Sequence, residues 1–389
     1  MEAKITKYIK EHLVGDYQIW FIVLLLNIFG LLIQFSTKSR MTMSGPFEPL
    51  TSIVKTIGIL IASFYLMSWI SRQNYIKITR FSNIFLFLSW ALILFAYFFG
   101  ESKGGASRWI NLGFVSFMPS DMAKLCLTAS LAKIFSTRQA DQSQYNIATA
   151  IVILILIGVT CFLIMLSNFS TSILIFMTSI VLMFFGRVPI KYISGIVGIV
   201  AFVAVMVVSL GIGQRAATVR SRIATFIMRV SEHDKSKLKE MNKSDENYQI
   251  NLSKYAISTG ALIPKGPGNS QYRYLLSQAE SDFIYAIILE EYGLFMGILI
   301  PLFFLWFMWR GSSVIRYSGK PLGGLLSAGL TFSIVIQAFI NMLVAVGAGP
   351  VTGQPLPMIS AGGTSLVFTA ISIGLILSIS RDKEMETKI

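Results

Sequence analysis

Ten long apolar runs constrain this chain more than any other feature. They lie at 18–36, 50–70, 79–99, 117–135, 147–166, 169–186, 190–211, 282–308, 322–346 and 358–380. A helix needs about 20 mainly apolar residues to cross the roughly 30 Å hydrocarbon layer of a bilayer. We therefore predict an all-α polytopic membrane protein of about ten transmembrane helices, with residues 1–389 forming a single domain.

Composition agrees with this class and argues against others. Charged residues make up 13% of the chain, about half the roughly 25% of a typical soluble domain. The net charge of +14 lies mostly at the ends of apolar runs, which favours contact with the membrane surface and gives no reason for a nucleic-acid partner. Cys126 and Cys161 lie in apolar runs without metal-like spacing, so neither a disulfide framework nor a zinc site is expected.

The basic residues predict which side of the membrane each loop faces. If the N-terminus is cytoplasmic, most Lys and Arg of the short connections fall on the inner side, and the short outer loops hold only Lys38, Arg40, Lys103 and Arg108. This agrees with the positive-inside rule, from which long loops are exempt. Both termini are then cytoplasmic, and one large extracytoplasmic loop, 212–281, joins the seventh and eighth helices.

Two outer segments carry polar groups that a simple connector would not need. In 103–125, Arg108–Trp109 precedes a Pro-Ser-Asp helix start, and Asp121 and Lys124 are three residues apart. Arg108 and Trp109 are equally typical of an aromatic belt with a snorkelling cation, and Asp121 with Lys124 of a structural ion pair. The segment 349–366 is rich in Pro and Gly, which lets a backbone turn sharply or approach a ligand.

A third stretch, Gln278–Gly293, runs from the large loop into an apolar helix. It carries Asp282 at its outer end and Glu290 and Glu291 about two turns deeper. An acid at the centre of a spanning helix costs roughly 2.5–3.5 kcal/mol on insertion scales, so these residues need a reason. Asp282 could cap the helix N-terminus, where the dipole favours an acid, or it could perform chemistry at the water–membrane boundary.

The large loop also holds a basic amphipathic segment. Arg215, Arg220, Arg222 and Arg229 recur at roughly helical spacing, with apolar residues between them. Such a segment is typical of the membrane interface. Its guanidinium groups could also bind a lipid-linked phosphate, because they pair with phosphate oxygens in a bidentate manner.

Taken together, these segments resemble the SEDS family (shape, elongation, division and sporulation proteins, including FtsW, RodA and SpoVE). The resemblance covers essentially the whole chain and rests on Gly105–Gly113, Met118–Leu125, Ser277–Ala286 with Glu290–Gly293, and Leu356–Ser365, with Asn247–Gln249 as a weaker fourth match. Departures from the family pattern are Ser277, Gln278 and Glu280 in place of Pro-Glu-x-His, Met118 for Gln, Asp121 for Glu and Ala361 for Tyr.

The resemblance implies a peptidoglycan glycosyltransferase that polymerises lipid II at the outer face of the bacterial cytoplasmic membrane. It also implies a class B penicillin-binding protein as partner, together with divisome or elongasome proteins and membrane lipids. We favour an FtsW-like role in division; a RodA-like elongation polymerase is the alternative within the family. A lipid II flippase or other transporter is the alternative from another class, and a purely structural scaffold is a third.

On this hypothesis, Asp282 is the catalytic base, and a divalent cation (Mg²⁺ or Mn²⁺) could bridge it to the diphosphate of the substrate. Arg108 and Lys124, with Arg215 or Arg220, would hold the diphosphate, and Trp109 would pack on the sugar or lipid. The other expected substrate-binding residues are Asp121, Gln249, Glu290, Ser360, Gly362 and Gly363. Transport predicts essential ionisable groups through the full membrane depth, whereas polymerisation predicts a decisive acid at the outer mouth.

Overall fold

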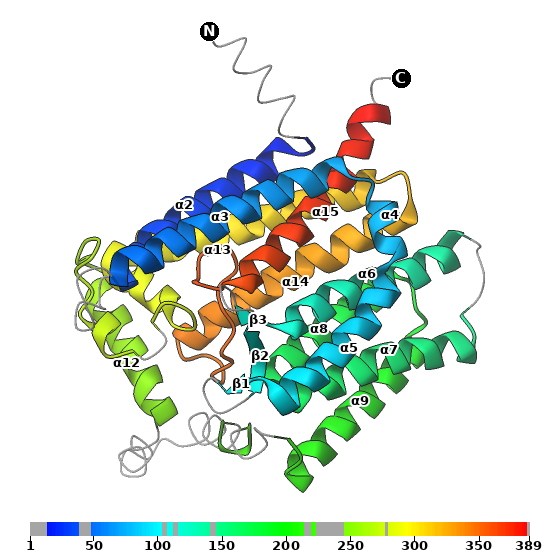
Figure 1. Cartoon of the computed structure of the whole chain (residues 1–389), viewed down its shortest axis with the longest axis horizontal. Helices are drawn as coiled ribbons and strands as arrows, with labels where there is room; N and C mark the ends of the chain where they lie inside the picture. Colours follow the sequence, from blue (N-terminus) through cyan, green and yellow to red (C-terminus); the bar gives the residue numbers. More distant parts are fainter. Residues whose placement is uncertain are drawn as a thin grey trace.

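The computed structural model describes residues 14–38, 48–102, 107–111, 116–140, 145–213, 219–222, 245–276 and 279–386 (Figure 1). The helices of the first half are α2 (Tyr17–Lys38), α3 (Glu48–Arg72), α4 (Tyr75–Arg80), α5 (Ser82–Phe99), α6 (Pro119–Ala140), α7 (Ile147–Met165), α8 (Phe169–Phe185) and α9 (Ile190–Leu210). The second half holds α12 (Asp245–Gly260), the 3-10 turn η2 (Tyr272–Tyr274), α13 (Ile284–Tyr317), α14 (Pro321–Ala345) and α15 (Thr364–Glu386).

The predicted class of all-α polytopic membrane protein is confirmed. Each of the ten predicted runs coincides with a described helix: α2, α3, α5 to α9, α13, α14 and α15. Within the described residues, eight helices are long and apolar enough to span a membrane. Charged residues keep α6 outside that group, and α8 is only 17 residues long. Ten crossings, the sidedness of the loops and a single domain stay predictions, and part of 212–281 lies outside the described residues.

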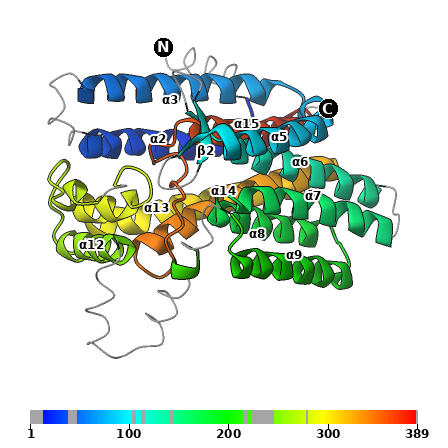
Figure 2. The ribbon, with the colours of Figure 1, turned by 60° about the horizontal axis from the view of Figure 1, so that its bottom comes forward.

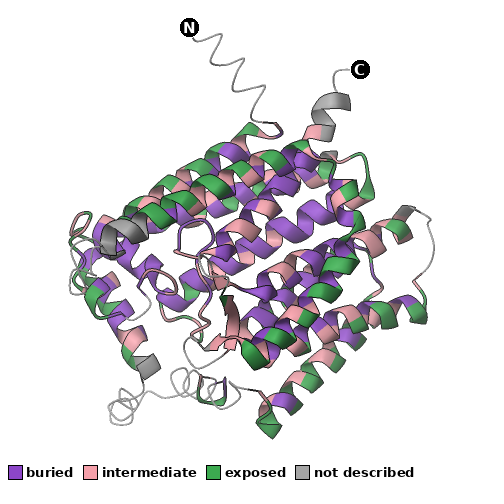
Figure 3. Ribbon diagram, in the orientation of Figure 1, coloured by how far each residue is buried: buried purple, intermediate pink, exposed green. Residues whose placement is uncertain are grey.

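The helices pack in layers around α14 and α15. In the apolar stretches of α14 and α15, 72% of the residues are buried, whereas in that stretch of α9 only 11% are. Figure 3 shows the same contrast between the centre and the rim of the bundle. Figure 2 places α3 at one outer edge and α9 at the other. Small residues allow the central contacts: a Cβ at Gly329 of α14 would lie 2.5 Å from Thr128 Cγ2 on α6.

The long helix α13 is broken at Gly293, where φ is 74° and ψ is −170°. A residue with a Cβ is strained in this conformation, so glycine is required here. The break frees backbone groups that the loop after α12 then pairs. Lys265 N and Gly266 N donate to the carbonyls of Glu290 and Glu291 at 3.1 and 2.9 Å. The loop therefore replaces the helical hydrogen bonds that the break removes.

Three short strands link α5 to α6, and the sequence did not predict them. β1 (Glu101–Ser102), β2 (Ser107–Asn111) and β3 (Ser116–Phe117) pair in antiparallel order β1-β2-β3. The register places Glu101 opposite Trp109 and Ile110 opposite Phe117. Because strands this short depend on tertiary contacts, hydrophobic pattern alone does not reveal them. They position Arg108 at the end of the bundle.

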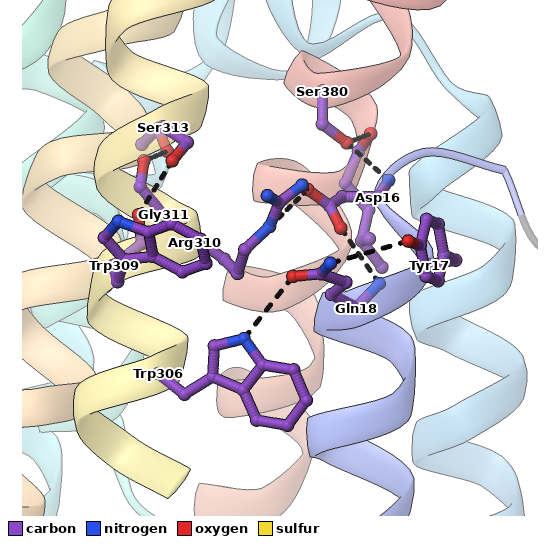
Figure 4. Close-up of polar contacts among 11 residues, drawn as sticks. Asp16, Tyr17, Gln18, Trp306, Trp309, Arg310, Gly311, Ser313 and Ser380 are labelled. Atoms are coloured by element: carbon purple, nitrogen blue, oxygen red, sulfur yellow. Dashed lines mark hydrogen bonds and ion pairs between the residues drawn. The ribbon is translucent and has the colours of Figure 1, made fainter. Parts of the chain in front are cut away.

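A polar cluster ties three helices together at the opposite end of the bundle, where α2 begins and α15 ends (Figure 4). The Asp16 carboxylate pairs with the Arg310 guanidinium of α13, and Asp16 N donates to Ser380 Oγ on α15 at 3.0 Å. Trp306 Nε1 donates to Gln18 Oε1 at 3.4 Å. The Asp16–Arg310 pair therefore lies at this end of the bundle.

Candidate active site

Three segments that are distant in sequence meet at the mouth of the bundle. Ser360 Oγ donates to Ser281 O at 2.8 Å, and Ala361 N donates to Glu280 O at 3.1 Å. Thr364 Oγ1, just after the Gly362–Gly363 turn, donates to Ser116 O at 3.1 Å. Figure 1 shows the strands beside the connection between α14 and α15. The turn before α15 is thus fixed to the segment that carries Asp282 on one side and to β3 on the other.

Asp282 is half-buried and lies immediately before α13. The N-cap position of α13 is Phe283 and not Asp282, so the capping role is not what places this acid. Ser281 Oγ donates to Asp282 Oδ1 at 3.1 Å, and Asn341 Nδ2 of α14 donates to the Asp282 carbonyl at 3.1 Å. A Cβ at Gly353, where φ is +66°, would lie 3.5 Å from Asp282 Oδ2. The glycine therefore leaves space in front of the carboxylate.

Arg108 brings a positive charge from β2 towards this carboxylate. Burial lowers the pKa of the Arg108 guanidinium, and the nearby Asp282 carboxylate raises it in opposition. The Arg222 guanidinium lowers the pKa of Arg108 further, because two like charges lie within electrostatic range. Arg108 Nε and Nη1 are buried without a hydrogen-bond partner among the described residues. Buried donors of this kind are usually paired, which marks the place as a site for water or a ligand.

Among the described residues of the large loop, Arg222 reaches the site; it belongs to the predicted basic segment, although Arg215 or Arg220 was expected to hold the diphosphate. Arg222 Nη1 donates to Val351 O at 2.7 Å, in the loop that also carries Gly353. The predicted Arg220 instead donates to the carbonyls of Val208 and Ser209 at the end of α9, with its Nε 2.8 Å from Val208 O. Arg215 lies outside the described residues. Because Arg220 and Arg222 are two residues apart, their side chains point in different directions and bind different partners.

Asp121 is buried and Lys124 is half-buried on α6, and Asp121 is within electrostatic range of Arg108. Lys124 Nζ donates to Gln337 Oε1 at 2.8 Å, and Gln337 Nε2 donates to Pro355 O at 3.0 Å. Asp121 is within electrostatic range of both Lys124 and Arg108, and its Oδ2 is buried without a partner among the described residues. Lys124 is therefore connected, through the side-chain amide of Gln337, to the loop that carries Pro355.

Two amide side chains on α14 donate to backbone carbonyls around the site, and neither was predicted from the sequence. Gln337 and Asn341 are four residues apart, hence on one helix face. Asn341 Nδ2 donates both to the Asp282 carbonyl and, at 2.7 Å, to the carbonyl of Gln354. Two amides in an otherwise apolar span are a signal that could have found them, because buried amides need partners.

Glu290, which was predicted to bind substrate, lies in a separate cluster. It is fully buried and accepts hydrogen bonds from Lys265 Nζ at 2.5 Å, from Gln271 N at 3.0 Å and from Ser270 Oγ. The neighbouring Glu291 accepts from Ser36 Oγ at 2.5 Å. Glu290 is about 9 Å along α13 from its first residue, Ile284, at 1.5 Å per residue, and Asp282 lies before that first residue. This carboxylate supports the broken helix at the end remote from Asp282.

The remaining predicted residues lie around the mouth at different distances from Asp282. Trp109 is half-buried in β2, next to Arg108, and Gln249 is half-buried in the first turns of α12. Ser360 is held in place, accepting from Leu356 N at 2.8 Å. Gly363 has φ +46° and open space around the position of a Cβ. No group of three or more His, Cys, Asp or Glu side chains suited to a metal occurs among the described residues.

The fold and site together define a multi-pass helical membrane protein with an acid and two guanidinium groups at one mouth of its bundle. The family model for cell cycle proteins of the FtsW, RodA and SpoVE type matches residues 16–385, so the chain belongs to this family. It is a protein of the bacterial cytoplasmic membrane.

Named relatives cover nearly the full chain. "Probable peptidoglycan glycosyltransferase FtsW" of Bacillus subtilis is 30% identical, covering 94% of this chain and 90% of its own length. "Stage V sporulation protein E" of the same organism is 27% identical, covering 94% and 97%. Among solved structures, a chain of a peptidoglycan synthase complex shares the fold with a TM-score of 0.72 at 18% identity, covering 95% of this chain and 98% of its own. Rod shape determining protein RodA of Thermus thermophilus gives a TM-score of 0.65 at 19% identity, covering 96% and 99%.

Proposed function

We propose that this protein is a peptidoglycan glycosyltransferase that joins lipid II units into glycan strands, with the role in division that its FtsW relatives suggest. The observation that carries the proposal is the Asp282 carboxylate within electrostatic range of Arg108, which is also within range of Arg222. The charged groups linked in this way are Arg108, Arg222 and Lys124 against Asp282 and Asp121, which leaves one excess positive charge. That excess suits a substrate with an anionic leaving group.

The chemistry is an inverting glycosyl transfer. Asp282 takes the proton of the acceptor sugar hydroxyl, and the resulting oxygen forms a bond to the anomeric carbon of the donor sugar. The bond from that carbon to the diphosphate oxygen breaks, and the undecaprenyl diphosphate leaves with the electron pair. Arg108 and Arg222 stabilise its growing charge through charge-assisted hydrogen bonds. Lys124 and Arg215 are the other predicted diphosphate ligands, and Arg215 lies outside the described residues.

An apolar groove gives the lipid tail a place beside the polar mouth. It has a volume of about 880 Å³ and lies between α2, α3 and α15. Met358 and Leu366 line it, and these two residues flank the Ser360–Gly363 turn in sequence. A polyprenyl chain in the groove would bring its diphosphate to that turn.

A divalent cation has few protein ligands available here. Asp282 is accompanied by the cations Arg108 and Arg222, and hard cations such as Mg²⁺ bind best to several oxygens. A bound Mg²⁺ or Mn²⁺ would therefore take one carboxylate from the protein and the remaining oxygens from the diphosphate and water. The chemistry it would supply is neutralisation of the leaving group, a role that the two guanidinium groups can also perform.

A partner that crosslinks the strands fits the same proposal. The solved complex of similar fold coordinates polymerization and crosslinking in a peptidoglycan synthase. We propose a class B penicillin-binding protein as partner of this chain, within the divisome. The transporter alternative is less well supported, because Glu290 is paired with Lys265 of the loop after α12, and Glu291 accepts from Ser36 of α2 and from Ser270 N of that loop.

The experiment is polymerisation of labelled lipid II by the purified, partner-bound protein in detergent. A polymerase makes long glycan strands in micelles, whereas a flippase needs two separated leaflets and makes no polymer. Arg108→Lys should reduce lipid II use far more than protein abundance, because lysine loses the bidentate geometry. Equal loss of both would assign Arg108 a structural role. A parallel reaction with chelator tests the divalent cation.

A further inference from the structure

The loop after α12 ends in an apolar tip, Leu262–Ile263. The two side chains are 89% and 81% exposed, more than any other large apolar side chain in the described part of the chain. The tip follows α12 directly and precedes Pro264. Exposed aliphatic residues in pairs usually mark a contact with another apolar phase.

Hydrogen bonds fix the height of this tip on the bundle. Leu294 N of α13 donates to Ala261 O at 2.9 Å, immediately before the tip, and Lys265 N donates to Glu290 O immediately after it. The loop is thus attached on both sides of the break at Gly293. The tip therefore lies at the level of Leu294.

The distance from Leu294 to the other end of the bundle is short enough to place Leu294 inside the hydrocarbon layer. Leu294 is 16 residues before Arg310, which pairs with Asp16 at the other end of the bundle. At 1.5 Å per residue the separation is about 24 Å, less than the roughly 30 Å of a hydrocarbon core. If Arg310 marks one boundary, the other lies a few residues beyond Leu294, near Glu290.

The exposed surface of α13 also begins at this level. Residues 283–291 are all buried, as is Gly293. From the break onward an apolar stripe is exposed, with Phe295 at 75% and Ile298 at 51%, and it continues through Leu302, Leu305 and Trp309. Leu294, at the start of this stripe, is 49% exposed and donates to Ala261 O next to the tip, and the stripe lies on a helix apolar enough to span a membrane. The same apolar phase should therefore cover both.

We propose that Leu262 and Ile263 insert into the outer leaflet at the boundary between headgroups and hydrocarbon. The irregular backbone of the tip keeps it at this boundary, because unpaired backbone groups are unfavourable deeper in lipid. The inserted tip anchors the loop that pairs with Glu290 and the break, and so steadies the short helical segment of α13 before Gly293, which follows Asp282. This contact with lipid is independent of the reaction that the protein catalyses.

Spin labels in nanodiscs test the proposal on the full-length protein without its partner. Leu262→Cys and Ile263→Cys are each made in a Cys126→Ala/Cys161→Ala background. Phe295→Cys serves as the lipid-facing control, and Lys320→Cys, exposed in the connection before α14, as the water-facing control. We expect labels at the tip to be relaxed more by oxygen than by a water-soluble nickel chelate, as at Phe295. A preference for the nickel chelate, as at Lys320, would overturn the proposal.

A second measurement keeps the test independent of the cysteine-free background. Ile263→Trp is placed in the natural chain, and the added fluorescence over the parent protein is recorded in vesicles of brominated lipids. Quenching that is strongest with bromines near the headgroup supports insertion. Fluorescence that bromine does not quench shows that water or protein covers the tip. Either covering, water or protein, would contradict contact with lipid.

Discussion

The pairing of Glu290 with Lys265 can be measured as a coupling free energy. Glu290 is fully buried, Lys265 is 21% exposed, and the ammonium lies 2.5 Å from the carboxylate. Removing one partner of a buried ion pair typically costs 3–5 kcal/mol. For Lys265→Met we expect about 3 kcal/mol, at the lower end, because Ser270 and Gln271 still donate to the carboxylate and water reaches the partly exposed side.

The double variant Lys265→Met/Glu290→Gln should be less destabilised than the sum of the two single variants. Without its partner, a neutral amide at position 290 is easier to bury than a carboxylate. We expect a coupling of about 1.5 kcal/mol or more from the double-mutant cycle. Reversible unfolding in mixed micelles supplies the four free energies. Lys320→Met, at an exposed lysine, is the control and should change stability by at most about 0.5 kcal/mol.

This cycle separates two roles for Glu290. If it supports the broken helix, stability changes while the KM for lipid II stays close to that of the natural protein. If it binds substrate, as the sequence analysis predicted, Glu290→Gln raises the KM and the two substitutions add in stability. Additive effects, or a Lys265→Met variant as stable as the control, would refute the structural role.

Three further outcomes are expected. Gly293→Ala should cost about 1–3 kcal/mol of stability, because the backbone at this position has a positive φ. Gly158→Ala is the control and should be neutral or stabilising, because there is open space around a Cβ at Gly158. Equal melting temperatures for the two variants would contradict this expectation. Asn341→Leu should lower polymerisation about tenfold or more at normal abundance, because two buried carbonyls lose a donor; an unchanged rate would remove its positioning role. Arg222→Gln should raise the KM for lipid II by about tenfold or more while Arg220→Gln leaves it nearly unchanged; the reverse order would reassign the diphosphate site.

Much of the fold could be predicted from the sequence because spanning helices obey one simple constraint. Apolar length located the ten helices that the predicted runs cover, but not α4 or α12, and loop polarity located the segments that meet at the mouth. The boundary of α15 was less accurate: the run at 358–380 was expected to be helical throughout, but α15 begins at Thr364. Met358 and Gly363 have positive φ, a backbone conformation that hydropathy does not report.

Side-chain partners were harder to predict than positions. Arg220 and Arg222 have the same chemistry, and only the local helical register turns one to α9 and the other to Val351. Glu290 lies in the helix that follows Asp282, but the loop that binds it comes from residues 265–271, whose return to α13 depends on the break at Gly293. Gln337 and Asn341 were overlooked because only charged groups in the spans were considered.

The most direct measurement compares Asp282→Asn with the natural protein, separating lipid II binding from strand synthesis. The amide keeps the size of the side chain but cannot take a proton, and a general base contributes roughly 10²–10⁴-fold to a rate. We expect binding within a fewfold of the natural protein and strand synthesis reduced by about 10²-fold or more. Synthesis at a near-natural rate would contradict the account, because the base would then have to be another group.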